Sequence, residues 1–236
     1  MNLKNIKNNM IILCGGRGKR MGKITNKIPK PLIKVAKKPI IEHKLTFYKS
    51  QGLKNFIFCL GYKSNQLRKF LKKKLPHSFY HDAGEKAGIL KRISLVKSYI
   101  KDNTIISYGD TLAKINFLDL VKSHKKSKCA LTIVAAPIQN PFGIVNWNSK
   151  GKALFFDEKP ILNHYIGYSV ISPNFFDMLN KRIINLKDGK GIIQAIKHLI
   201  KRKQVNIYKF KNLQITINSP EELKYARLNY KKYFTI

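Results

Sequence analysis

Short apolar runs alternate with amphipathic segments along this chain, and this rhythm constrains the fold more than any other feature. Short apolar runs bounded by turn residues are typical of buried strands, and apolar residues along one side of a longer segment indicate helices. The expected strands are Met10–Leu13, Asn55–Leu60, Thr104–Tyr108, Ala130–Ala136, Gly143–Asn148, Ala153–Asp157, Tyr165–Ile171, Val205–Phe210 and Gln214–Ile217. The expected helices are Pro39–Ser50, Asn65–Lys73, Leu90–Lys101, Phe117–Lys125, Asn174–Leu179 and Ile192–Arg202. This alternation predicts an α/β fold with a mostly parallel sheet covered on both faces, and ligands outside the carboxyl ends of the strands.

Two further patterns refine this prediction. The turn Ser149-Lys150-Gly151 separates the two expected strands around it, which are therefore expected to form a hairpin. A last helix is expected to begin at Pro220, with Ser219 as its N-cap and Glu222 closing a capping box.

A glycine-rich turn directly follows the first expected strand. The segment Gly15-Gly16-Arg17-Gly18-Lys19-Arg20 has backbone amides that can approach phosphate oxygens closely, with three basic side chains beside them. Farther along, Lys30 stands between Pro29 and Pro31, which restrict its backbone and suit a lysine that meets a phosphate in fixed geometry. The alternative is an ordinary tight turn with solvated basic residues, and the proline-flanked lysine argues against it.

Two common nucleotide-binding motifs are excluded by spacing. The pattern GxxxxGK[ST] is absent, because Gly18-Lys19 is followed by Arg20. The glycines are spaced G-G-x-G, and the second expected strand runs into Gly61-Tyr62-Lys63 rather than into an acidic residue that would bind a ribose.

These residues follow the pattern L-x-G-G-x-G-x-R-[LM], then P-K-P-[LM], from Leu13 to Met21 and from Pro29 to Leu32. In this the chain resembles the sugar-phosphate nucleotidylyltransferases (NDP-sugar pyrophosphorylases). Further blocks in family order are 55–71, 87–93, 108–110, 141–145 and 156–160. The resemblance implies a Rossmann-like three-layer sandwich with a mostly parallel mixed sheet, the glycosyltransferase-A-like nucleotidyltransferase fold. The length of 236 residues and the absence of a linker predict a single domain over 1–236.

The resemblance also implies an enzyme that transfers an NMP moiety from an NTP to a sugar 1-phosphate and releases pyrophosphate, for activated-sugar and surface polysaccharide biosynthesis. The segments GYK, LKR and YGD look most like those of glucose-1-phosphate cytidylyltransferases. CTP is therefore the expected donor, with GTP, UTP and dTTP left open.

Residue roles follow from the same resemblance. The implied catalytic residues are Arg20, on the leaving pyrophosphate, and Lys30, at the α-phosphorus. The implied nucleotide-binding residues are Leu13, Gly15, Gly16, Gly18, Lys19 and Gly88, the last in the base-contacting loop 85–88. The implied residues for the second substrate are Gly143, Glu158 and Lys159.

Mg²⁺ is the expected cofactor, with Asp110 as a ligand. Asp110 follows a strand and a glycine, so its carboxylate can project into the crevice, and Mg²⁺ takes few carboxylates plus phosphate oxygens. A structural turn aspartate is the alternative. The family usually carries a second aspartate late in the chain, where this sequence offers Asn218 or Thr216; Asn218 is favoured, because its amide oxygen can ligate Mg²⁺.

The acceptor pocket departs from the family pattern as well. Tyr165-Ile166-Gly167-Tyr168 stands where relatives carry an asparagine that bonds sugar hydroxyls, and Ala87 replaces a commoner glycine in the base loop. A non-sugar phosphate such as phosphocholine is therefore one alternative acceptor. A non-catalytic, nucleotide-binding relative is another alternative, which the Thr216/Asn218 block allows.

The chain carries 47 basic and 12 acidic residues, a net charge of +35. The basic residues are spread along the chain, so we expect solvated faces rather than a dedicated nucleic-acid surface, with nucleic-acid binding as a third hypothesis. The three cysteines lack metal-ligand spacing, and no apolar run is long enough for a membrane span or a secretory signal. The expected partners are an NTP and a small phosphorylated substrate in the cytoplasm, with no membrane and with homo-oligomerisation left open.

Overall fold

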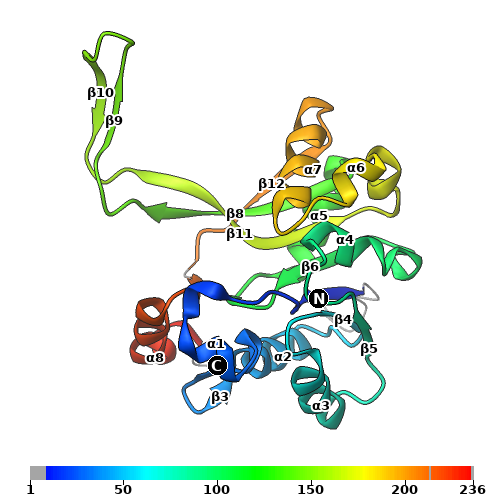
Figure 1. Ribbon diagram of the computed structural model, residues 1–236. Helices are drawn as coiled ribbons and strands as arrows, with labels where there is room; N and C mark the ends of the chain where they lie inside the picture. Colours follow the sequence, from blue (N-terminus) through cyan, green and yellow to red (C-terminus); the bar gives the residue numbers. More distant parts are fainter. Residues whose placement is uncertain (1–8, 213, 235–236) are drawn as a thin grey trace.

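A seven-stranded sheet in the order β12-β8-β11-β6-β1-β4-β5 forms the centre of the computed structural model, which describes residues 9–212 and 214–234 (Figure 1). Its strands are β1 (Met10–Leu13), β4 (Phe56–Leu60), β5 (Phe79–Asp82), β6 (Thr104–Tyr108), β8 (Leu131–Gln139), β11 (Ile161–Ile171) and β12 (Val205–Lys209). Strand β11 runs antiparallel to its neighbours β6 and β8, and the other neighbouring strands pair in parallel. The expected α/β fold with a mostly parallel mixed sheet is confirmed.

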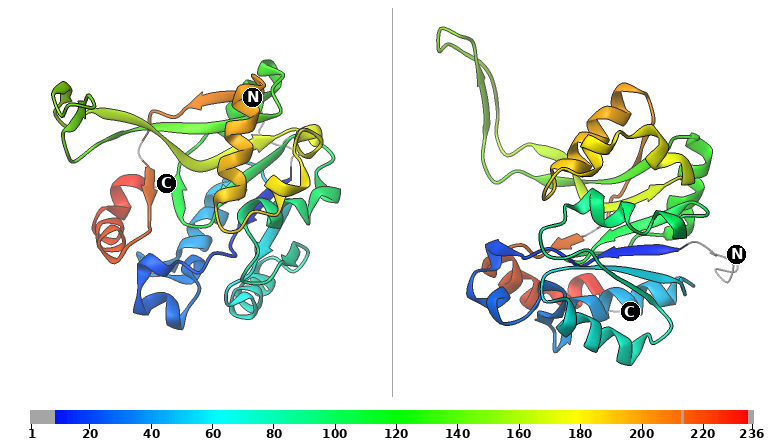
Figure 2. Two further views of the ribbon diagram at one scale, coloured as in Figure 1. Left: turned by 45° about the horizontal axis from the view of Figure 1, so that its top comes forward. Right: turned by 45° about the vertical axis from the view of Figure 1, so that its right-hand side comes forward.

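Alternating side chains divide the core into two layers, one on each face of the sheet. Met10 and Ile12 of β1 pack with α2, α3 and α5, whereas Ile11 packs with α4 and α7 (Figure 2). The helices are α2 (Ile40–Ser50), α3 (Ser64–Lys74), α4 (Ile89–Ser94), α5 (Phe117–Ser127) and α7 (Lys190–Lys201). Helices on both faces make the molecule a three-layer sandwich, and they leave the strand ends open for a site.

A smaller apolar cluster attaches the last helix, α8 (Pro220–Phe234), beside the sheet. The short strands in this region are β2 (Lys34–Val35), β3 (Lys38–Pro39), β7 (Thr111–Ala113) and β13 (Gln214–Thr216). The expected capping box is confirmed, because the Glu222 amide donates to Ser219 Oγ at 3.2 Å and the Ser219 amide donates to Glu222 Oε2 at 3.1 Å. The capping box fixes the start of α8 at Pro220, two residues after Asn218.

Two predicted helices differ from the structure. The helix expected over Leu90–Lys101 was wrong in its length: α4 ends at Ser94, and a short 3-10 turn, Lys97–Tyr99, follows. The Lys91 carbonyl accepts the Leu95 amide at 3.1 Å, the last bond of this helix, and the Val96 amide then donates to the Ile93 carbonyl three residues back, so the chain continues with 3-10 bonding. The segment expected as a helix over Asn174–Leu179 is a 3-10 helix, Pro173–Met178.

Several short elements were not expected from the sequence. They are the 3-10 turns η2 (Lys19–Met21) and η3 (Lys30–Leu32), the helices α1 (Lys23–Lys27) and α6 (Lys181–Ile184), and strands β2, β3, β5 and β7. Most of them are too short to show a period of apolar residues, and β5, which is as long as the predicted β1, lacks its apolar run.

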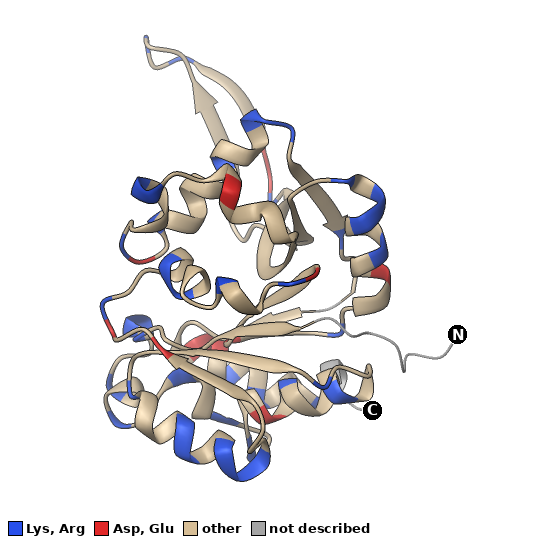
Figure 3. Ribbon diagram, turned by 90° about the vertical axis from the view of Figure 1, so that its right-hand side faces the viewer, with Lys and Arg blue, Asp and Glu red and all other residues tan. Residues whose placement is uncertain are grey.

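Basic side chains are distributed over the helices of both outer layers rather than gathered on one element (Figure 3). In the part of the chain that the structure describes, no helix combines the length and apolarity needed to cross a bilayer.

A buried histidine links α5 to the sheet and predicts how stability depends on pH. His124 bonds through Nδ1 to Thr132 Oγ1 at 2.8 Å and through Nε2 to Ser172 Oγ at 2.9 Å. Burial lowers the pKa of His124 from its ordinary value of 6.5 to about 4. Because the unfolded chain takes up this proton at a higher pH than the folded chain, the stabilisation is complete above about pH 6.5 and is lost as the pH falls toward 4.

We therefore expect the free energy of unfolding to fall below pH 6.5, with His124 contributing up to about 1.4 kcal/mol per pH unit. Urea unfolding of the wild type and of His124→Gln at several pH values between 4 and 7 tests this. The variant should show a shallower dependence on pH, and equal slopes in the two proteins would contradict the prediction.

Candidate active site

A cavity of about 580 Å³ opens at the carboxyl ends of β1 and β6, where ligands bind in this class of sheet. It brings together segments that lie far apart in the sequence. The lining residues include Leu13 to Arg20, Lys30, Pro31, Glu85 to Ala87, Ile89, Arg92, Tyr108 to Asp110, Asp188, Gly189 and Asn218. The predicted catalytic, metal-binding and nucleotide-binding residues are all in this lining except Gly88, which lies between two lining residues.

The glycine turn after β1 forms one wall of the cavity. Gly18 has a left-handed backbone, with φ of 65°, a conformation that favours glycine. Thr25 Oγ1 donates to the Gly18 carbonyl at 3.2 Å and so ties the turn to α1. A side chain at position 18 would lie only 3.4 Å from Lys30 Cδ, so this glycine lets the stem of Lys30 pack against the turn.

Lys30 occupies the centre of a polar cluster at the cavity floor. Its Nζ donates to Asp110 Oδ2 at 2.6 Å and to Asn218 Oδ1 at 2.9 Å. The Lys30 side chain is only 10% exposed and that of Asp110 is 23% exposed, so water screens their attraction weakly. Residues separated by 80 and 188 positions in the sequence therefore meet at one ammonium group.

Strand pairing explains how Asp110 and Asn218 come together. Asp110 immediately precedes β7, and β13 ends two residues before Asn218. The two strands are antiparallel, with Thr111 opposite Thr216, and the Ile217 amide donates to the Asp110 carbonyl at 3.1 Å. This register brings Asn218 beside Asp110.

Thr216, the alternative to Asn218 in the sequence, makes different contacts. Its hydroxyl donates to Gln214 Oε1 at 2.9 Å and lies 3.3 Å from Thr111 Oγ1. Thr216 is absent from the lining of the first cavity, whereas Asn218 is part of it. The structure thus brings Asn218, and not Thr216, into contact with the Lys30 ammonium.

The opposite wall is the loop that follows β5, and a buried arginine holds it. Arg92 of α4 is 4% exposed, and it donates through Nη1 to the Leu60 carbonyl and through Nη2 to the Glu85 carbonyl at 3.0 Å. A side-chain carbon at Gly15 or Gly61 would overlap its guanidinium group. Arg92 therefore joins the end of β4 to the base loop, and its guanidinium group packs closely against both glycines.

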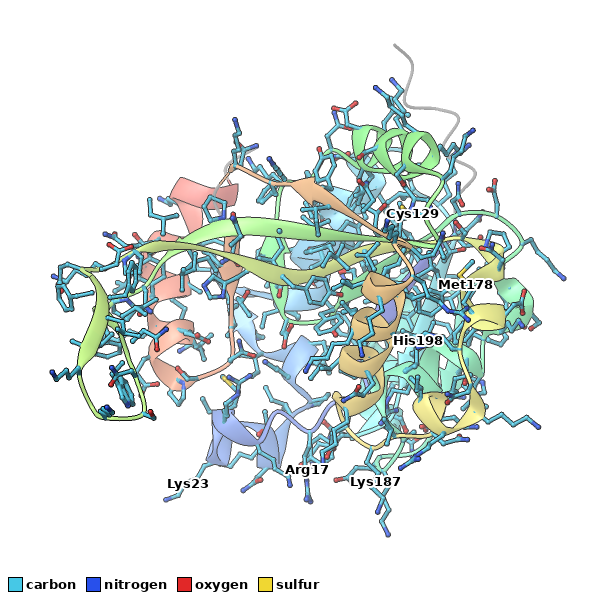
Figure 4. The ribbon with its side chains drawn as sticks, turned by 90° about the horizontal axis from the view of Figure 1, so that it is seen from above. Arg17, Lys23, Cys129, Met178, Lys187 and His198 are labelled. Carbon is cyan, nitrogen blue, oxygen red and sulfur yellow. The ribbon has the colours of Figure 1, made fainter. Side chains whose placement is uncertain are left out.

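The base loop also contacts the connection between α6 and α7. The Ile89 amide donates to the Asp188 carbonyl at 2.8 Å, and a side-chain carbon at Gly88 would overlap the Leu186 carbonyl. Seen from above, Arg17 and Lys187 lie at the same edge of the molecule (Figure 4). Gly88 thus permits the close approach that closes this side of the cavity.

The electrostatics of the cavity suit an anionic ligand. Arg17, Lys19 and Arg20 are exposed along its rim, and Arg17 Nε pairs with Glu85 Oε1 at 3.0 Å across the two walls. Burial raises the pKa of the Cys14 thiol, which therefore stays protonated and does not offer a thiolate nucleophile. The arrangement can bind and position phosphates, and it resembles the charge-neutralising sites that phosphoryl transfer requires.

A family model described as nucleotidyl transferase matches residues 9–213, most of the chain. This chain belongs to the nucleotidyl transferase family. The enzyme class that the sequence implied is thereby confirmed.

Two relatives of this nucleotidyl transferase are similar to it over nearly their whole length. A protein of Bacillus subtilis described as a probable glucose-1-phosphate cytidylyltransferase is 31% identical, covering 90% of this chain and 92% of its own. The D-glycero-alpha-D-manno-heptose 1-phosphate guanylyltransferase of Campylobacter jejuni is 25% identical, covering 93% and 98%. The solved structure of HddC from Yersinia pseudotuberculosis, complexed with GMP-PN, has the same fold, with a TM-score of 0.73 and 19% identity over 95% of this chain and 100% of that one.

A second cavity of about 850 Å³ adjoins the first in this nucleotidyl transferase. Both cavities share the lining residues Arg20, Ile89, Tyr108, Asp110 and Asn218. The second is also lined by Thr111, Ile138, His164, Tyr165, Ile166, Gly167, Gln214, Ile215, Thr216, Glu221, Glu222 and Tyr225. The Lys30 partners therefore stand where two binding spaces meet.

Aromatic side chains shape the second cavity. The rings of Tyr108 and Tyr165 meet edge to face at 5.9 Å, and Tyr108 packs on Gly167, whose φ is 77°. Burial raises the pKa of Tyr165 to about 12, so its hydroxyl is neutral near pH 7. The unusual tyrosine block noted in the sequence is thus part of this wall.

The residues predicted for the second substrate lie elsewhere. Gly143 precedes β9 (Ile144–Trp147), and Glu158 and Lys159 follow β10 (Ala153–Asp157), in a hairpin that extends from the body. Glu158 and Lys159 form an ion pair at 3.6 Å and are both more than half exposed. None of the three lines either cavity. The sequence motif gave their positions along the chain, but it could not give their distance from the site.

Sequence analysis missed four contributors to the site. Arg92 and Tyr108 were quoted only inside family blocks, and Asp188 and Gly189 carry no motif at all. The sequence carries no signal for Arg92, because the close approach of its guanidinium group to Gly15 and Gly61 is visible only in the structure. Nothing in the sequence pattern indicates that the start of α7 packs beside the base loop.

Proposed function

We propose that this nucleotidyl transferase transfers a nucleoside monophosphate, preferably CMP, from an NTP to a sugar 1-phosphate. The observation that carries the proposal is the contact of the Lys30 ammonium with Asp110 and Asn218, two residues that line both adjoining cavities. One cavity takes the triphosphate and the other the acceptor, with the reacting atoms meeting between them. We infer that the whole chain acts as one domain, in the cytoplasm.

The proposed reaction is one displacement at the α-phosphorus. An oxygen of the acceptor phosphate forms the new bond to this phosphorus, and the bond to the oxygen that bridges to the β-phosphorus breaks. Pyrophosphate leaves with that electron pair, toward Arg20. The acceptor phosphate is already a nucleophile, so the step needs no general base.

The chain's own residues position and neutralise the reacting groups. The amides of the glycine turn and Lys19 hold the triphosphate, and Lys30 donates to the α-phosphate where charge develops. Such donors act most strongly in a partly desolvated site, and the low exposure of Lys30 provides one.

Asp110 and Asn218 fit a Mg²⁺ site. Their two oxygens already converge on one cation, the Lys30 ammonium, which is the type of donor set that Mg²⁺ combines with phosphate oxygens and water. The described residues contain no group of three or more His, Cys, Asp or Glu side chains suited to a metal, so the nucleotide would supply further ligands. When bound, Mg²⁺ would neutralise the triphosphate and polarise the α-phosphoryl group. We propose Asn218, rather than Thr216, as the second ligand.

Two features support CMP as the preferred group. The Bacillus subtilis relative is described as a cytidylyltransferase. Glu85 lines the first cavity, and a carboxylate accepts a hydrogen bond from the exocyclic amine of cytosine, where uracil and thymine present a carbonyl.

The second cavity also favours one other acceptor, phosphocholine. Tyr108, Tyr165 and Tyr225 line it together with Glu221 and Glu222. Aromatic faces and carboxylates bind quaternary ammonium groups.

A pyrophosphate-release screen tests the proposal. CTP, UTP, GTP and dTTP are each combined with Mg²⁺ and a panel of sugar 1-phosphates and phosphocholine. We expect release with a sugar 1-phosphate, fastest with CTP, and none after removal of Mg²⁺ by EDTA. NTP binding in calorimetry without release for any acceptor would instead indicate a non-catalytic relative, and release with phosphocholine alone would replace the sugar by that acceptor.

A further inference from the structure

A lysine is buried in the core, on a helix that carries none of the residues lining the two cavities. Lys44 lies in the middle of α2, which packs on one face of the sheet (Figure 1), and it is only 1% exposed. Among the described residues, 9–212 and 214–234, no ion pair includes it. Taking an ammonium group out of water is costly, and an apolar side chain of similar volume would avoid that cost. A buried ammonium without a carboxylate partner therefore indicates a role beyond packing.

Neutral groups hold this ammonium in place. Lys44 Nζ donates to the Thr111 carbonyl and, at 2.8 Å, to the Tyr168 hydroxyl. It also lies over the rings of Tyr168 and Tyr48, at 4.7 and 5.3 Å from their centroids. The Tyr168 hydroxyl donates in turn to the Thr111 carbonyl at 2.9 Å. Two donors thus converge on one carbonyl oxygen.

That carbonyl belongs to the residue that follows Asp110. Thr111 begins β7, so Lys44 and Tyr168 fix the backbone immediately after the proposed metal ligand. The carbonyl of Asp110 itself accepts the Ile217 amide at 3.1 Å, which ties the same stretch to β13. The direction in which the Asp110 carboxylate projects depends on this backbone. Lys44 therefore acts on Asp110 through the main chain, whereas Lys30 contacts the carboxylate itself.

The Lys44 ammonium also lies close to both cavities. Cys14 lines the first cavity, and burial is the main cause of its raised thiol pKa. The charges of Lys44 and Asp110 act on this pKa in opposite directions, so both lie near the thiol. Tyr168 directly follows Ile166 and Gly167, which line the second cavity. One buried ammonium thus connects the backbone beside Asp110 to the wall of the second cavity.

We propose that Lys44 is a positioning residue, whose ammonium holds the Thr111 carbonyl and thereby fixes Asp110 for a Mg²⁺–nucleotide complex. This role rests on the metal site proposed at Asp110 and Asn218. Groups that orient a metal ligand from behind commonly contribute roughly ten- to a hundredfold to metal affinity. Charge alone predicts the opposite sign, because removal of a nearby positive charge would strengthen the binding of a cation. The direction of the change therefore separates the two effects.

Lys44→Met tests this role, since it replaces the ammonium by an uncharged side chain of similar length. The dissociation constant of whichever NTP binds most tightly is measured by calorimetry, once with Mg²⁺ and once in EDTA. In Lys44→Met we expect the constant with Mg²⁺ to rise about tenfold and the constant in EDTA to change less than about twofold. An unchanged or lower constant with Mg²⁺ would overturn the proposal, and so would an equal rise in EDTA.

Tyr48→Phe is the matched control in the same buried network. The Tyr48 hydroxyl lies 2.6 Å from Ser107 Oγ and donates to the Tyr168 hydroxyl at 3.1 Å, rather than to the Thr111 carbonyl. Its loss disturbs the core, as urea unfolding will record, but both NTP constants should stay within about twofold of the wild type. A rise with Mg²⁺ as large as that of Lys44→Met would indicate a general loosening of the core and would overturn the proposal.

Tyr168→Phe keeps the proposal falsifiable if circular dichroism shows that Lys44→Met does not fold. It removes the second donor to the Thr111 carbonyl and leaves the aromatic ring in place. We expect the NTP constant with Mg²⁺ to rise about threefold, again without a rise in EDTA. No rise in this variant would overturn the role of the Thr111 carbonyl.

The wild type separates this proposal from the proposed reaction. Tighter NTP binding with Mg²⁺ than in EDTA, without pyrophosphate release for any acceptor, would contradict the reaction alone, because binding needs no turnover. NTP binding that is the same with Mg²⁺ and in EDTA would contradict the metal site and would overturn the role of Lys44 with it.

Discussion

Replacing Lys30 by alanine is expected to lower kcat/KM for pyrophosphate release by about 10²–10³-fold. The change removes the ammonium group that contacts Asp110 and Asn218, at the place where charge develops on the α-phosphate in the proposed reaction. Most of the loss should fall on kcat, because the glycine turn and the rim residues still bind the triphosphate. Steady-state kinetics with the best NTP and acceptor pair measures this.

A nearby lysine provides the matched control for this experiment. Lys23 begins α1, is exposed and points away from the body (Figure 4). Lys23→Ala removes the same charge from the same basic region, and its kcat/KM should stay close to that of the wild type. Asp110→Ala should match Lys30→Ala in its loss. Unchanged turnover in both Lys30→Ala and Asp110→Ala would refute the roles proposed for this cluster.

The second large effect is expected at Gly88. Its backbone is extended, with φ of −69°, so alanine meets no local strain there, but its side-chain carbon would overlap the Leu186 carbonyl. A backbone atom cannot move aside as a flexible side chain can. We expect Gly88→Ala to lower the free energy of unfolding by about 1–3 kcal/mol, measured by urea denaturation.

The same substitution should also weaken nucleotide binding. Relief of the overlap moves the Leu186–Asp188 segment away from the base loop. This changes the cavity, because Glu85 and Ile89 line it on one side of the contact and Asp188 lines it on the other. We expect the NTP dissociation constant to rise about tenfold or more in calorimetry, equivalent to about 1.4 kcal/mol.

Gly16→Ala is the control for stability. A side-chain carbon at position 16 has no neighbour within 4 Å, so its effect on the free energy of unfolding should stay within about 0.5 kcal/mol. If Gly88→Ala is as stable as Gly16→Ala and binds NTP normally, the close packing of the base loop against the start of α7 is wrong.

Pattern analysis predicted the long elements of the fold well. Strand β1 and strand β6 have the expected bounds, and α2, α5 and α7 begin or end within two residues of expectation. These segments have clear periods of buried side chains. The failures occur at short elements and at the ends of elements, such as the end of α4 at Ser94.

The candidate site was predictable to the extent that its residues are local. The glycine turn and Lys30 lie close together in the sequence, so their residue types indicate the chemistry without the structure. The sequence favoured Asn218 over Thr216 from ligand chemistry, but the contact of Asn218 with Lys30 could not be predicted, because it depends on the register of β13 against β7, which connects distant parts of the chain.

The order of residues alone determined the α/β alternation, the glycine-rich turn after β1 and the capped start of α8, because each rests on interactions between near neighbours in the chain. Only the tertiary structure decided that Lys30 contacts Asp110 and Asn218. It also decided that Arg92 donates a hydrogen bond to the base loop, and that the β9–β10 hairpin places Glu158 and Lys159 outside both cavities. Those outcomes depend on long-range strand pairing and close packing, and the balance of such contacts is settled only when the whole sheet is assembled.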